Sequence, residues 1–99
     1  MNDVFQSAFR IDRGHPALAG HFPGNPVVPG VVMLERVAAA LQTWRGERVQ
    51  KIDAKFVQPL RPDEDAVIDL HADAARIRFV LTRADGVPLA RGTLRSARA

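Results

Sequence analysis

The sequence contains no cysteine and only one tryptophan. Without cysteine the chain forms no disulfide, thiolate nucleophile or zinc–thiolate site, which suits a reducing cytosol. No apolar run approaches the roughly 20 residues of a membrane-spanning helix. The first residues, Met-Asn-Asp-Val, lack the basic and apolar regions of a signal peptide. These absences predict a cytoplasmic protein with no membrane partner.

What is present fits one small domain spanning residues 1–99. The sequence has 99 residues, 46% of them hydrophobic and 25% charged, without repeats or low-complexity tracts. A chain of this size buries roughly 60–65% of its unfolded surface, which gives a marginal core. We therefore expect a partner subunit to contribute to stability.

Periodicity predicts one strand, a long loop and one helix in the first half. Apolar residues alternate with polar ones over residues 5–11, as in a strand. Residues 13–29 are rich in proline and glycine and predict a loop. Residues 31–41 are almost all apolar, which predicts a buried helix running to Trp44 or Arg45 and ending at Gly46.

The second half alternates with the period of two that is typical of strands. The alternating segments are residues 52–56, 66–70 and 77–81, and residues 89–97 are predicted as the last strand, with Pro88 at its start. Asp73-Ala74 and Asp85-Gly86 supply turns, so the later strands should be antiparallel neighbours. This order predicts an α+β fold in which a curved antiparallel sheet wraps around one central helix.

One segment combines groups suited to acid–base chemistry. Residues 20–35 place His21 in a loop and Glu35 in the second turn of the helix. Eliminating water beside a thioester needs a base, an acid and a donor for the carbonyl oxygen. His21 is suited to act as the base, because the ordinary pKa of histidine is about 6.5. Apolar neighbours would raise the pKa of Glu35 and keep it protonated.

The third requirement falls to the helix N-terminus. Its first N–H groups have no intrahelical acceptor and carry the positive end of the helix dipole. We expect the N–H of Gly30 to bind the thioester oxygen, since glycine leaves room for its approach. Other loop residues would shape the site: Phe22, Pro23, Gly24, Val27 and Pro29.

These residues carry a specific resemblance. His21-Phe22-Pro23-Gly24, Pro26, Pro29-Gly30-Val31 and Glu35 resemble the active-site segment of the β-hydroxyacyl-acyl-carrier-protein dehydratases, the FabZ and FabA type of hotdog-fold enzyme. Residues 56–65 resemble the family's Phe-x-x-Pro-x-x-Pro-Gly-Asp, with Asp63-Glu64 at the usual glycine step. Glutamate as the acid points to the branch that does not isomerise the double bond.

The resemblance implies a hotdog fold and a dehydratase of fatty-acid or related lipid or polyene synthesis. His21 and Glu35 would be the catalytic pair, and Gly30 would donate to the thioester oxygen. No metal or organic cofactor is implied, because the substrate is carried on the phosphopantetheine of acyl carrier protein. The site would form between two subunits of a homodimer or a related hotdog heterodimer.

Basic residues gather in the last quarter of the chain. Alternation places Arg76 and Arg78 on one face of a strand, and Arg91 and Arg95 on one face of another. Such a patch would dock an acidic carrier protein, although solvation of the sheet exterior explains it equally well. Nucleic acid is not expected as a partner, because the sequence lacks interleaved aromatics and recognition motifs.

Other interpretations stay open at this point. A hotdog thioesterase would use a carboxylate to activate water against the same carbonyl, whereas a non-catalytic scaffold would have lost His21 or Glu35. A metal site from His15, His21 and Glu35 matches no standard ligand spacing. Trp44 is expected to pack at the end of the helix or against a partner.

Overall fold

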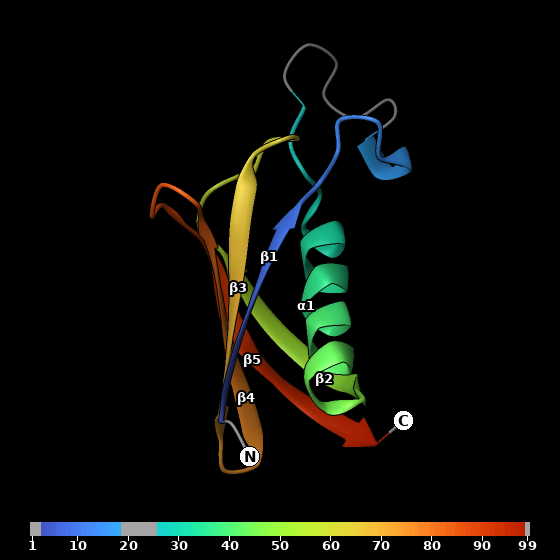
Figure 1. Cartoon of the computed structure of the whole chain (residues 1–99), viewed down its shortest axis with the longest axis vertical. Coiled ribbons are helices and arrows are strands. Elements are labelled where there is room, and N and C mark those ends of the chain that lie inside the picture. Colours follow the sequence, from blue (N-terminus) through green and yellow to red (C-terminus); the bar gives the residue numbers. More distant parts are fainter. Residues whose placement is uncertain (1–2, 19–25, 99) are drawn as a thin grey trace.

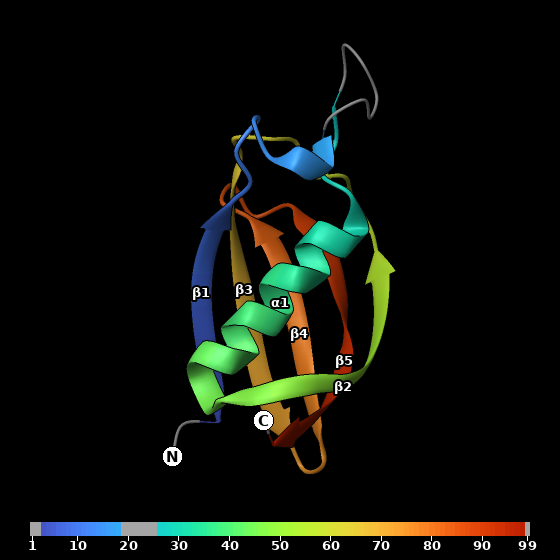
Figure 2. The same cartoon turned by 90° about the vertical axis from the view of Figure 1, so that its right-hand side faces the viewer.

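The computed structural model describes residues 3–18 and 26–98. Its sheet has five antiparallel strands in the order β1-β3-β4-β5-β2, and the helix α1 lies across one face (Figures 1 and 2). The predicted helix wrapped by a curved sheet is confirmed as a hotdog fold. The elements, in order, are β1 (Val4–Arg10), the 3₁₀ turn η1 (Pro16–Leu18), α1 (Gly30–Arg45), β2 (Glu47–Phe56), β3 (Asp65–Asp73), β4 (Arg76–Arg83) and β5 (Pro88–Arg98).

The helix begins and ends where the sequence predicts. It starts directly after Pro29 and ends at Gly46, whose φ of 65° is the left-handed conformation of a C-cap. The N–H of Gly46 donates to the carbonyl of Gln42 at 2.8 Å. At this end Trp44 stacks on Phe5 of β1, with ring centroids 5.9 Å apart, which confirms its expected packing role.

Only one side of α1 is buried in the single chain, so the prediction of burial all round is wrong. The side chains that face the sheet are Val32, Met33, Val37, Ala40 and Leu41. On the opposite side Val31 is 63% exposed, and Glu35 and Ala39 are exposed. Nothing else in the described chain covers this side, because the sheet lies against α1 from one direction only (Figure 1).

The three central strands form the core as expected. Residues that alternate along β3 and β4, among them Ile68, Phe79 and Leu81, are almost fully buried and face α1. Ala74, with a φ of 54°, lies in the turn between β3 and β4, and Gly86, with a φ of 97°, lies in the turn before β5. The predicted hairpins are therefore confirmed.

The strand β2 differs from its prediction in extent and in burial. It begins at Glu47, because the left-handed Gly46 reverses the chain at once and lets β2 pair with the end of β5. Ala54 and Phe56 are exposed although they alternate like core positions. The physical reason is that β2 is an edge strand: it pairs with β5 on one side, and no strand within residues 3–18 and 26–98 pairs with its other side.

Candidate active site

The first turn of α1 presents unpaired backbone donors. The N-cap residue Pro29 makes no side-chain hydrogen bond to the helix. Its carbonyl accepts from the N–H of Val32 at 3.0 Å and of Met33 at 3.4 Å. Among the described residues, no backbone acceptor meets the N–H groups of Gly30 and Val31. The positive end of the helix is thus available to bind a carbonyl oxygen or an oxyanion.

Gly30 has a different steric role from the one expected. A Cβ at this position would lie 2.7 Å from Cζ of Phe56 and 3.0 Å from Cε2, closer than real Cβ contacts. The Phe56 ring, and not an incoming thioester, occupies the space of the missing side chain. The expectation that glycine leaves room for the thioester oxygen is therefore corrected, while the N–H of Gly30 remains without a backbone acceptor.

A hollow of about 410 Å³ lies beside this turn. It is lined by Val28, Gly30, Met33, Phe56, Val57, Gln58 and Pro59. Phe56 and Val57 are 45% and 44% exposed, so the hollow has an apolar rim that is open to solvent. An apolar hollow beside free backbone donors is suited to holding an acyl thioester.

Glu35 lies on the other side of the helix. It shares the exposed side of α1 with Val31 and is not part of the lining of the hollow. Its side chain is exposed and forms no ion pair within residues 3–18 and 26–98. The burial on which the predicted acid role rested is therefore absent from the single chain. One subunit alone does not bring Glu35 to the free donors.

The other residues of the predicted motif precede α1 in the sequence. His21 lies outside the described residues, as do Phe22, Pro23 and Gly24. Of the remaining predicted loop residues, Val27 and Pro29 are half-buried directly before α1. His15 accepts a hydrogen bond from the N–H of Ala17 at 3.0 Å and so acts as a turn residue. No cluster of metal-ligating side chains occurs in the part of the chain that is described.

The four predicted arginines do share one surface. All lie on the side of the sheet opposite α1, where the register places two lysines of β2 beside them. We call this surface the basic face; it comprises Lys51, Lys55, Arg76, Arg78, Arg91 and Arg95. Sequence reasoning missed the lysines, although Lys51 and Lys55 alternate with Ile52 and Ala54. The alternation of the lysines is visible in the sequence, but the pairing of β2 with β5, which brings them beside the arginines, is not.

Two adjoining hollows lie in the basic face. The larger, about 490 Å³, is lined by Lys55, Arg78 and Arg91 around the apolar Ala54 and Val80. The smaller, about 150 Å³, is lined by Lys51, Arg76, Arg95 and Thr93. The larger hollow lies nearer the candidate site, because Lys55 directly precedes Phe56. Asp53 is the acidic residue that lines both.

Comparison with known proteins identifies the family of the chain. Residues 1–93 match the model of the ApeI-like family, described as ApeI dehydratase. The chain is 32% identical over 89 residues to the 3-hydroxyacyl-[acyl-carrier-protein] dehydratase FabZ of Klebsiella pneumoniae, covering 78% of this chain and 58% of the relative. The FabZ of Fusobacterium nucleatum is 33% identical over 69 residues, covering 62% and 49%. The chain thus spans about half the length of these relatives.

Solved structures share the fold. A chain of the dehydratase heterocomplex ApeI:P from Xenorhabdus doucetiae superposes with a TM-score of 0.82 at 23% identity, covering 97% of this chain and 88% of that one. The (R)-hydratase from A. caviae involved in PHA biosynthesis gives 0.74 at 10% identity, covering 97% and 94%. A 1,4-dihydroxy-2-naphthoyl-CoA thioesterase from Synechocystis gives 0.69 at 14%, covering 95% and 80%. Fold and family model together show that the chain belongs to the ApeI-like family of hotdog-fold dehydratases.

Proposed function

We propose that the protein removes water from a β-hydroxyacyl thioester to give the trans-2-enoyl thioester. The observation that carries the proposal is the first turn of α1 in an ApeI-like chain. The N–H groups of this turn that meet no backbone acceptor among the described residues adjoin an apolar hollow. The N–H of Gly30 binds the thioester oxygen and stabilises the charge that develops on it. The Phe56 ring lies beside Gly30 on the side of β2.

Two side chains move the protons in this proposal. His21 takes the proton from the α carbon, and the electron pair left behind forms the new double bond. The bond from the β carbon to the hydroxyl oxygen breaks, and Glu35 protonates the oxygen as it leaves as water. The reaction is balanced without a metal or organic cofactor.

The site is completed by a second subunit. Glu35 lies on a side of α1 where Val31 is 63% exposed and nothing in the described chain supplies cover. A second hotdog chain packed on this side would remove Glu35 from water and enclose the site. The partner is a second copy of the chain or a related hotdog subunit. The similarity to a chain of the ApeI:P heterocomplex is the reason for including a related subunit beside a second copy.

The substrate is carried on acyl carrier protein, and the basic face docks that carrier. Lys55 lies directly opposite Arg91 in the β2–β5 pairing, and Lys51 lies opposite Arg95. Like charges opposite one another destabilise a sheet, so their presence is explained best by an acidic partner. The named activity of the FabZ relatives also includes an acyl-carrier-protein substrate. The pathway would be fatty-acid or related lipid or polyene synthesis in the cytoplasm.

A direct assay tests the function. The purified protein, alone and with a related hotdog subunit, is incubated with β-hydroxyacyl chains of several lengths on acyl carrier protein. Mass spectrometry of the carrier should show the loss of one water. Release of the free carrier would instead indicate thioester hydrolysis, which a thioesterase of the same fold would perform. An unchanged substrate with every partner would contradict both activities.

A further inference from the structure

Three cations form a row across the side of the sheet opposite α1, at the end of the basic face farther from the candidate active site. Lys51 of β2 lies directly opposite Arg95 of β5. The pairing of Ile77 with Leu94 brings Arg76 of β4 next to Arg95 on its other side. Arg95 therefore has a cation on each neighbouring strand, at a Cβ separation of about 5 Å, and like charges placed in this way destabilise a sheet.

The nearby carboxylates do not compensate this row. Within residues 3–18 and 26–98, none of its three cations forms an ion pair. Asp73 lies opposite Arg76, but its carboxylate pairs with Arg78, at 4.0 Å. Asp53 lies opposite Thr93, one step along the strands from the row. The row thus keeps an excess of positive charge.

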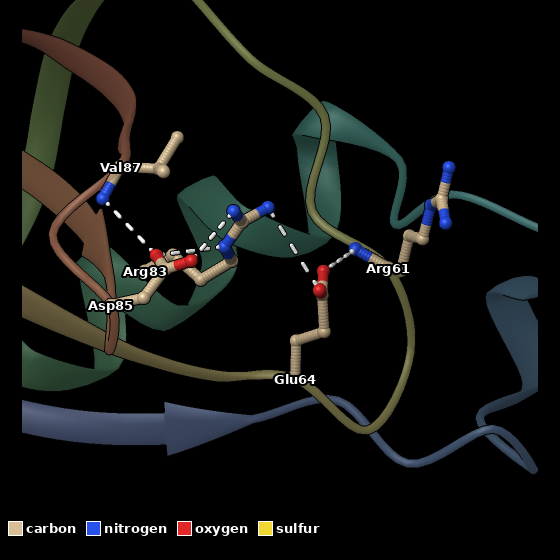
Figure 3. Close-up of polar contacts among 5 residues, drawn as sticks. All are labelled: Arg61, Glu64, Arg83, Asp85 and Val87. Carbon is tan, nitrogen blue, oxygen red and sulfur yellow. Dashed lines mark hydrogen bonds and ion pairs between the residues drawn. The ribbon is translucent and has the colours of Figure 1, made fainter.

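Another arginine of β4 shows how the chain compensates a cation internally. The guanidinium of Arg83 lies between the carboxylates of Glu64 and Asp85 (Figure 3). It binds Asp85 at 2.8 Å and lies 3.9 Å from Glu64. Since the row around Arg95 has no such arrangement in the described chain, its charge is available to an anion from solution.

The row borders the smaller hollow of the basic face, which has a volume of about 150 Å³. Thr93 adds a hydroxyl group to the three cations, and Asp53 is the carboxylate of the described lining. Two guanidinium groups, one ammonium group and one hydroxyl group can donate hydrogen bonds into one small space. Such a set suits an anion with several oxygen atoms better than an acyl chain, because the lining is mainly polar and charged.

We propose that this hollow binds the dianionic phosphate group of a small soluble molecule. A phosphate group has enough oxygen atoms to accept from donors on three strands at once, whereas a carboxylate has only two. Its two negative charges also offset more of the repulsion around Arg95 than the single charge of a carboxylate or a phosphodiester. The bound phosphate joins the edge strand β2 to β5 and β4. This site is independent of the proposed function, because the carrier is expected beside Lys55 and Arg91.

Calorimetric titration with inorganic phosphate tests the site at about pH 8, where phosphate is mainly dianionic. Sodium chloride keeps the ionic strength constant, so that screening alone gives no signal. Arg95→Gln removes the centre of the row and should weaken phosphate binding at least about tenfold. Lys51→Gln, on the edge strand, should weaken it by at least about threefold and provides a second variant.

Thermal denaturation separates ligand binding from a structural role. In chloride alone, Arg95→Gln should melt at or above the wild-type temperature, because the repulsion along the row is relieved. Phosphate at about ten times its wild-type Kd should raise the melting temperature of the wild type by about 5 °C. At the same concentration, Arg95→Gln should gain no more than about 2 °C.

The matched control is Arg98→Gln, which makes the same change of net charge on the same strand. Arg98 is exposed, lies opposite Glu47 and is outside the described lining of the hollow, so Kd for phosphate should change less than about twofold. Glycerol phosphate should bind about as tightly as inorganic phosphate, which would identify a phosphate monoester. Acetate and dimethyl phosphate, a diester like the phosphopantetheine linkage, should bind at least about tenfold more weakly.

Three results would overturn the proposal: phosphate that binds no better than chloride, equal losses in Arg95→Gln and Arg98→Gln, or equally tight binding of acetate or dimethyl phosphate. All are measured as binding and need no turnover. Absence of dehydratase activity would therefore overturn the proposed function and leave the phosphate site standing.

Discussion

The ring of Phe56, at the end of β2, occupies the space that a side chain at Gly30, at the beginning of α1, would need. This contact joins an edge strand to the helix terminus that bears the free N–H donors. Gly30 therefore has one observed role and one proposed role: the missing side chain admits the Phe56 ring, and in the proposed mechanism the N–H binds the thioester oxygen. The two roles are distinguishable by experiment.

Substitution of Gly30 should lower stability mainly by displacing the Phe56 ring. In Gly30→Ala the new methyl group overlaps the ring, and because Phe56 is 45% exposed the ring can move at a cost of about 1 kcal/mol in unfolding free energy. Thermal denaturation should show that Gly30→Ala/Phe56→Ala loses less stability than the sum of the two single variants. If Gly30→Ala lowers dehydratase activity and the double variant recovers it, the glycine is needed to make room for the Phe56 ring. If the double variant stays inactive, the methyl group also obstructs the thioester.

The proposed catalytic pair should act as a unit. His21→Ala and Glu35→Gln should each lower turnover by at least about a hundredfold, with the fold retained by circular dichroism. The double variant should be little worse than either single variant, because base and acid take part in one reaction. Near wild-type turnover in His21→Ala would remove this mechanism.

The two groups are expected to come from different subunits. When inactive His21→Ala chains are mixed with inactive Glu35→Gln chains, exchange of subunits should restore part of the activity, because each mixed dimer contains one intact site. Sedimentation at micromolar concentration checks the oligomeric state of the same samples. An active protein that sediments strictly as a monomer would contradict the shared site.

The basic face should affect KM for a carrier-bound substrate but not KM for a small substrate. Reversing the charges of Lys55 and Arg91, beside the candidate site, should raise KM for the carrier-bound substrate in a salt-sensitive way and leave KM for the pantetheine analogue unchanged. The same charge reversal at Arg76 and Arg95 serves as the comparison. Arg95 lies about 13 Å farther along β5 than Arg91, at about 3.3 Å per residue. We expect a smaller effect there, and an equal rise of KM on both substrates would assign the basic face to folding.

The Arg83–Asp85 contact should contribute to acid sensitivity. The Arg83 guanidinium, followed by the N–H of Val87, holds the pKa of Asp85 below its ordinary value. A lowered pKa in the folded state adds stability above the unfolded pKa, and this stability is lost as pH falls through the folded pKa. Melting temperatures measured below about pH 4 should therefore fall less steeply in Asp85→Asn than in the wild type. Parallel curves would contradict this contribution.

Much of the fold could be predicted from local patterns. The apolar run of α1 and the glycine after it determined the helix bounds, because capping depends on neighbouring residues. The alternation in β3 and β4 determined which side chains are buried. The His-Phe-Pro-Gly motif indicated the family in the same way, since it depends on residue identity and spacing alone.

Tertiary structure decided the features that join distant parts of the chain. The contact of Phe56 with Gly30 and the lysines beside Arg91 and Arg95 require a strand order and a register that periodicity does not specify. The exposure of Glu35 also could not be predicted from periodicity. An apolar helix predicts burial, but only the three-dimensional arrangement shows that one side of α1 faces the sheet and that the other side, with Glu35, is exposed.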